Sequence, residues 1–173
     1  MKKTGIDVVA LAEERAKDLL VLSLAHRDDL AVLETRDLNG FDFLCRVAEG
    51  RSLNTNKLFW IELKASVREP NGPRVRLSQD RAVVYAESRL PLCLFFYSMS
   101  DDIGYYVWMV EPTVTSTGKP ELTINRRLVP APSSDVELNA GDFTKVDPQS
   151  IAQVVASVNS YYDAVHQAYL EAA

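Results

Sequence analysis

The sequence predicts an α/β fold in which a mixed β-sheet packs against helices, with a further helix at the C-terminus. Apolar residues recur at helical spacing before about His26, whereas three later runs have the length and composition of strands. The segment 91–98 is continuously apolar, which is typical of a parallel strand that is covered on both faces. Together these patterns give the element order αβββαβ.

The first helix and the first three strands follow in that order. Thr4 and Asp7 resemble a capping box with Asp in the place of Glu, so we expect a helix from Thr4 to about His26. The apolar positions of this helix include Ala12, Ala16 and Leu20. The expected strands lie at 30–35, 41–47 and 58–64.

The second half of this core contains a helical crossover. A Pro- and Gly-containing loop at 68–73 precedes Ser78, which has the side chain of a helix N-cap, and the helix should run to about Arg89. The strand at 91–98 is then parallel to the preceding strand, and 105–110 forms an antiparallel neighbour.

The composition beyond the core indicates one domain without a second folding unit. Segment 122–128 is the one plausible strand in a region rich in Pro, Ser and Thr, and Asp147-Pro148 supplies an N-cap and a first-turn proline for a last amphipathic helix. The expected divisions are a core at about 4–110, an irregular connector at 111–146 and a C-terminal helix at 147–173.

Composition excludes several classes of protein. The 173 residues are 47% hydrophobic and 25% charged, as in an ordinary globular domain, and no apolar run approaches the roughly 18 residues of a membrane span, so we expect a cytoplasmic protein without membrane contact. Cys45 and Cys93 lie in expected strands without metal-ligand companions, which indicates reduced, buried thiols and no zinc site. The net charge of −5 argues against a protein that coats nucleic acid by bulk electrostatics.

Three charged residues stand where an apolar sheet should have none. Glu62 and Lys64 share one face of their strand, and Asp42 lies in the preceding strand just after the turn signal Asn39-Gly40. If the two strands pair, Asp42 and Glu62 converge at one end of the sheet. Two carboxylates about 4 Å apart repel by roughly 4 kcal/mol at an effective dielectric of 20, and an intervening divalent cation would reverse this into attraction.

This pattern resembles the PD-(D/E)XK nuclease superfamily, and in particular its small stand-alone prokaryotic domains of unknown function. Asp42 follows Gly40-Phe41 where many relatives have Gly-Ile-Asp, and Glu62-Leu63-Lys64 stands where they have Glu-Val-Lys. The helix motif of these relatives is matched by Ala12-Glu13, Ala16 and Leu20. The resemblance covers roughly 10–110 and implies a restriction-endonuclease-like core.

The resemblance also implies an activity, which is metal-dependent hydrolysis of phosphodiester bonds in nucleic acid, with DNA favoured over RNA. Its Mg²⁺ or Mn²⁺ ions would be bound by oxygen ligands from Asp42, Glu62, the Leu63 carbonyl and Glu13. Lys64 would orient or deprotonate the attacking water and stabilise the negative charge of the transition state. Glu13 is expected on or near the apolar face of its helix, where an unpaired carboxylate would need a cation.

Other residues have two interpretations. Some relatives place a Gln on the helix after the Glu-x-Lys strand, so Gln79 is either a further site residue or an ordinary first-turn residue. Arg68, Arg74 and Arg76 flank an expected exposed loop. They belong to the stretch 64–89, which contains six basic and three acidic residues. They either bind the phosphate backbone of nucleic acid or balance nearby acidic residues on a solvated face.

Two functions from other classes stay open. The chain could keep the nuclease scaffold without catalysis, as a binding or regulatory module in a defence or toxin system. It could also be a structural subunit that forms a homodimer through its last helix. A strand Glu-x-Lys by itself is most often a solvent-facing pair, and it is the combination with Asp42 and Glu13 that favours the enzyme.

Overall fold

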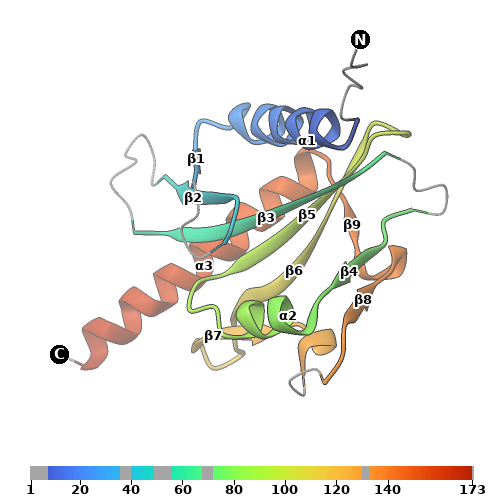
Figure 1. Cartoon of the computed structure of the whole chain (residues 1–173). Coiled ribbons are helices and arrows are strands. Elements are labelled where there is room, and N and C mark those ends of the chain that lie inside the picture. The colour runs from blue at the N-terminus through green and yellow to red at the C-terminus, as the bar shows by residue number, and fades with distance from the viewer. Residues whose placement is uncertain (1–7, 36–39, 49–55, 68–71, 130–132, 173) are drawn as a thin grey trace, which may run out of the picture.

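The structure is a computed structural model that describes residues 8–35, 40–48, 56–67, 72–129 and 133–172. Within these residues, seven strands form one mixed sheet and two short strands form a second (Figure 1). The elements are α1 (Val8–Ala25), β1 (Leu30–Glu34), β2 (Phe43–Val47), β3 (Leu58–Ser66), β4 (Val75–Leu77), α2 (Gln79–Ala86), β5 (Leu92–Ser98), β6 (Ile103–Val114), β7 (Pro120–Ile124), the 3-10 turn η1 (Arg126–Leu128), β8 (Val136–Leu138), the 3-10 turn η2 (Ala140–Asp142), β9 (Thr144–Lys145) and α3 (Pro148–Ala172).

The main sheet has the order β1-β2-β3-β5-β6-β7, with β9 paired to β6. The pairs β1–β2, β2–β3, β5–β6 and β6–β7 are antiparallel, whereas β3 and β5 are parallel. A crossover that contains β4 and α2 joins these two parallel strands. Every residue of β5 is buried, as expected for a strand at the centre of a sheet that is covered on both faces. The αβββαβ order and the C-terminal helix of the sequence prediction are therefore confirmed.

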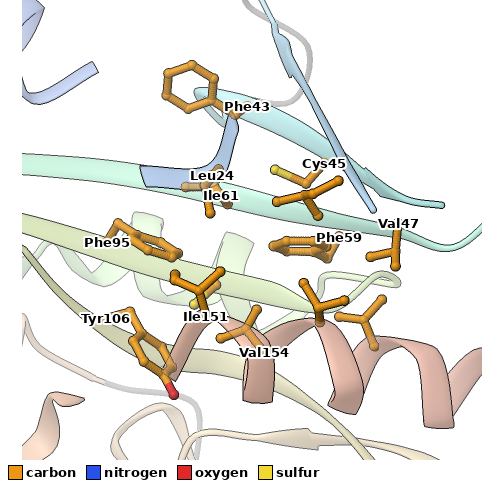
Figure 2. Close-up of a cluster of buried hydrophobic side chains, with 14 of the residues drawn as sticks. Leu24, Phe43, Cys45, Val47, Phe59, Ile61, Phe95, Tyr106, Ile151 and Val154 are labelled. Atoms are coloured by element: carbon orange, nitrogen blue, oxygen red, sulfur yellow. The ribbon is translucent and has the colours of Figure 1, made fainter. Parts of the chain in front are cut away.

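Helices α1 and α3 cover one face of the sheet. The buried residues of α1 recur at helical spacing and include Leu20 and Leu24, while Ile151 and Val154 of α3 pack against the same cluster. Figure 2 shows Phe59 of β3 and Phe95 of β5 opposite these two α3 residues. Cys45 and Cys93 are both free and lie in this cluster, so their predicted role as buried thiols is confirmed.

The opposite face of the sheet carries a second core under α2, β4 and β8. Ala82 and Tyr85 of α2 are fully buried against strand residues such as Leu94 and Met109. The N-cap of α2 is Ser78, whose side chain accepts a hydrogen bond from the Arg81 N–H, as the sequence predicted. The helix ends at Ala86, before the expected boundary near Arg89, while the Thr4–Asp7 capping box lies outside the described residues.

The prediction of an irregular connector with one strand at 111–146 is wrong. Strand β6 continues to Val114, and the expected strand at 122–128 is instead β7, which ends at Ile124, followed by η1. Strand β8 pairs with β4, and β9 pairs with β6. Strands of two or three residues have no measurable alternation, and their partners lie far away in the sequence, so local patterns could not predict them.

Helix α3 is buried in its first half and exposed in its second. Its N-terminus is capped as predicted, because the Ser150 N–H donates to Asp147 Oδ1 at 2.7 Å. Val165, Tyr169 and Leu170 are exposed near its end, so the homodimer through this helix stays a prediction. Among the helices of the described chain, none is long and apolar enough to cross a membrane.

Candidate active site

The pairing of β2 with β3 brings Asp42 next to Glu62. Phe43 is in register with Ile61, and the Asp42 N–H donates to the Ile61 carbonyl at 3.1 Å, so Asp42 continues the ladder one residue before β2. Its carboxylate Oδ2 accepts a hydrogen bond of 2.7 Å from the Leu63 N–H. The expected convergence of the two acidic residues therefore follows from strand register alone.

Glu62 is the one charged side chain in the described sheet core, with 2% of its surface exposed. Its two oxygens have separate partners. Lys64 Nζ lies 2.5 Å from Oε1, and Arg81 Nη2 lies 2.5 Å from Oε2. A buried carboxylate is tolerated only when it is paired and hydrogen-bonded, and both conditions are met here.

Arg81 lies on α2, and its guanidinium reaches Glu62 while it contacts other groups on its remaining sides. Its guanidinium also donates to the Gly40 carbonyl and lies over the rings of Phe41 and Tyr85, 5.2 and 5.0 Å from their centroids. Gly40 has φ +71°, and a Cβ atom there would come within 2.6 Å of Arg81 Nη1. This approach requires glycine for both its backbone conformation and its lack of a side chain.

The local electrostatics differ between the two carboxylates. Burial raises the pKa of Asp42 above its ordinary value; the hydrogen bond from the Leu63 N–H opposes this rise, and the Glu62 charge adds to it. Burial, together with the Glu62 charge, also raises the pKa of the Tyr85 hydroxyl, which is therefore neutral at physiological pH. Of these two carboxylates, Asp42 forms no ion pair within the described residues, whereas Glu62 binds Lys64 and Arg81.

A pocket of about 240 Å³ opens beside Asp42 and Lys64. Glu13 and Lys17 of α1 complete its wall together with Leu63 and Ala65. Glu62 is not part of the wall, but it forms an ion pair with Lys64, which is part of it. Glu13 was expected on or near the apolar face of α1; its side chain is exposed and lies beside the buried stripe that runs through Ala12 and Ala16.

The residues at the pocket suit a divalent cation in chemistry but not fully in arrangement. Asp42, Glu13 and Leu63 line the pocket, and carboxylate and carbonyl oxygens are the donors that Mg²⁺ and Mn²⁺ prefer. Glu62 does not fit such a role as it lies, since both of its oxygens already bind cationic side chains. In the part of the chain that the structure describes, no group of three or more His, Cys, Asp or Glu residues is placed to hold a metal ion.

The other expected site residues lie elsewhere. Gln79 is exposed at the start of α2 and is not on the pocket wall. Arg74 is exposed, and Arg76 forms an ion pair of 2.8 Å with Asp135, as the balancing interpretation expects. Arg68 lies outside the described residues, and Pro73 is buried, contrary to a fully exposed loop.

Arg81 is the residue that sequence reasoning missed. Its partner Glu62 lies 19 residues earlier in the sequence, so no local pattern links the two residues. One signal was available in the sequence: Arg81 and Tyr85 are four residues apart and therefore share a helix face, which becomes the face toward Glu62 once α2 docks on the sheet.

Comparison with known proteins gives one informative result. No protein-family model matches the sequence, and no curated protein matches it. Among solved structures, the chain is similar to the Holliday junction resolvase Hjc of the archaeal hyperthermophile Archaeoglobus fulgidus, with a TM-score of 0.50 and 12% sequence identity. The match covers 81% of this chain and 94% of the resolvase. At this identity the likeness shows the fold, which is restriction-endonuclease-like with a mixed central sheet.

Proposed function

We propose that this protein is a metal-dependent nuclease of the PD-(D/E)XK superfamily that hydrolyses phosphodiester bonds in DNA, with Asp42, Glu62 and Lys64 as its active site. One observation carries the proposal: Lys64 joins the buried Glu62 carboxylate to a pocket that Asp42 also lines. Burying an acid that holds a lysine at a pocket wall costs desolvation free energy, and charged groups placed so in a pocket are typical of functional sites.

The residues divide the chemistry as follows. Glu62 holds the Lys64 ammonium in one position, so that the positive charge is in place before a phosphate arrives. Lys64 then orients the attacking water and stabilises the negative charge that grows on the phosphate oxygens. Asp42, Glu13 and the Leu63 carbonyl would hold Mg²⁺ or Mn²⁺, which supplies Lewis-acid stabilisation when it is bound.

The choice of DNA rests on the structural neighbour, which is a Holliday junction resolvase. The pocket itself accommodates a phosphate from either nucleic acid. Exposed Arg74 is a candidate contact to the phosphate backbone, and Arg68 is proposed for the same role from the sequence alone.

The test is a cleavage assay with Mg²⁺ or Mn²⁺ on plasmid, linear, single-stranded and four-way-junction DNA and on RNA. We expect the wild type to cleave DNA and Lys64→Ala to cleave at least about 100-fold more slowly, the loss typical of removing one group that stabilises the transition state. Lys145→Ala is the matched control, because Lys145 is exposed on β9 and away from the pocket.

A second function is binding without cleavage, as in a regulatory module of a defence or toxin system. The observation that favours it is the occupation of Glu62 by two cationic side chains. In this case neither the wild type nor Lys64→Ala would cleave any substrate of the panel, while the wild type would still bind DNA in a salt-dependent manner.

A further inference from the structure

The cluster around Glu62 is electrically balanced without any external ion. Asp42 and Glu62 contribute two negative charges, and Lys64 and Arg81 contribute two positive ones. Both Glu62 oxygens are held at 2.5 Å by these cations. A divalent ion placed on Glu62 in this arrangement would meet a guanidinium already bound to the same carboxylate.

The position of Arg81 is built into the fold. Gly40 leaves the space that the guanidinium fills and accepts a hydrogen bond from it, and the Phe41 and Tyr85 rings flank it. Phe41 and Tyr85 are themselves packed with Trp60 in the second core. An arginine fixed by contacts on several sides keeps its geometry at low entropic cost, which a surface ion pair does not.

We propose that Arg81 is the resident cation of Glu62, and that a divalent ion can use Glu62 as a ligand only after Arg81 has left it. This inference rests on the proposed function, since it concerns which cation binds Glu62 in the same site. Lys64 reaches the other oxygen of Glu62, so it keeps its place when Arg81 moves. With a quarter of its side chain exposed, Arg81 has a path from Glu62 toward solvent.

Removal of the Arg81 charge should therefore strengthen metal binding, opposite to the usual effect of mutating a site residue. Titration calorimetry with Mn²⁺ alone should show Arg81→Gln binding at least about tenfold more tightly than the wild type, because a positive charge within a few ångströms of the ion is gone. Arg81→Met, which keeps an unbranched apolar side chain at this position, should behave in the same way and serves if Arg81→Gln is poorly folded.

Two controls make the comparison specific. Arg89→Gln removes an exposed arginine from the same stretch and should leave the Mn²⁺ affinity of the wild type unchanged. Arg81→Lys keeps the charge and should stay close to the wild type. Equal or weaker Mn²⁺ binding by folded Arg81→Gln and Arg81→Met would overturn the proposal.

The outcomes separate this inference from the proposed function. If the wild type cleaves DNA and the Arg81 variants bind Mn²⁺ no more tightly, the role of Arg81 is wrong and the nuclease stands. If the Arg81 variants bind Mn²⁺ more tightly but the wild type cleaves nothing, Arg81 is the resident cation of a site without catalysis.

Discussion

In the described part of the chain, Asp142 and Glu62 are each paired with two cationic side chains, but their structural surroundings differ. Asp142 lies at the end of η2, 3.2 Å from Arg127 and 3.7 Å from Arg126, and it also accepts a backbone hydrogen bond of 2.9 Å from Asn139. Glu62 lies within a strand of the central sheet and binds Lys64 and Arg81.

The difference indicates which of the two clusters is structural. Asp142 satisfies a free N–H group at the start of η2, so a local folding role accounts for it. The Asp142 side chain is 8% exposed, but its arginines are 84% and 43% exposed, so solvent screens the ion pairs from the arginine side. Glu62 caps no helix, and an apolar residue would fill its place in the sheet at lower cost. A charge kept at such a position points to function.

The largest effect that tests this comparison is on stability. We expect Glu62→Ala to lower the free energy of unfolding by about 3 kcal/mol, at the low end for a broken buried pair because Lys64 is 42% exposed. Asp142→Ala should cost about 1 kcal/mol, the loss of a cap with surface ion pairs. Urea denaturation measures both, and equal losses would remove the distinction between the clusters.

The pH dependence of stability should differ in sign between the two sites. Burial raises the pKa of Asp42, so the folded protein binds a proton at this carboxyl more readily than the unfolded chain does. The free energy of unfolding should therefore fall as the pH rises from the ordinary value of 3.8 through the raised pKa. Asp42→Asn should therefore raise the melting temperature at pH 7 by about 1–3 °C and have no effect at pH 3.

Asp142 should show the reverse. Burial alone would raise its pKa, but the Asn139 N–H and the two arginines outweigh burial and lower it below 3.8. Its contribution is present above the ordinary pKa and is lost as the pH falls through the lowered one. Asp142→Asn should lower the melting temperature at pH 7 and not at the acid end. Melting curves in which both variants shift in the same direction at pH 7 would contradict these assignments.

The fold was largely predictable because its decisive patterns are local. The helical stripe through Ala16 and Leu20, the apolar run of β5 and the Asp147-Pro148 start of α3 depend only on neighbours in the sequence. Alternation along β3 was sufficient to bring Glu62 and Lys64 to one face. The short strands β8 and β9 were missed because their identity depends on distant partners.

The candidate site was predictable only in part, for the same reason. Strand pairing brings Asp42 to Glu62 by register, whereas the reach of Arg81 depends on how α2 docks and on the space at Gly40. Glu13 was expected on or near the apolar face of its helix because it falls within the spacing of the stripe. In the structure the buried side of α1 runs through Ala12 and Ala16, and the exposed Glu13 lines the pocket with Asp42 and Lys64.

The smallest expected effect concerns the basic segment after the site. Arg74→Ala should lower the slope of log affinity for DNA against log salt by about 0.7–0.9, one phosphate contact, whereas Arg76→Ala should change it less because Asp135 already neutralises Arg76. Filter binding at several salt concentrations measures the slopes. Wild-type slopes in both variants would assign these arginines to charge balance on a solvated face.

The most direct test of the central claim is the single-turnover cleavage rate of Lys64→Ala beside Asp142→Asn, on the DNA that the wild type cleaves fastest, with Mg²⁺ or Mn²⁺ at a temperature where all three proteins are folded. We predict a rate at least about 100-fold lower for Lys64→Ala and a rate within about twofold of the wild type for Asp142→Asn. A Lys64→Ala protein that cleaves as fast as the wild type, or a wild type that cleaves no nucleic acid, would contradict the assignment of this site.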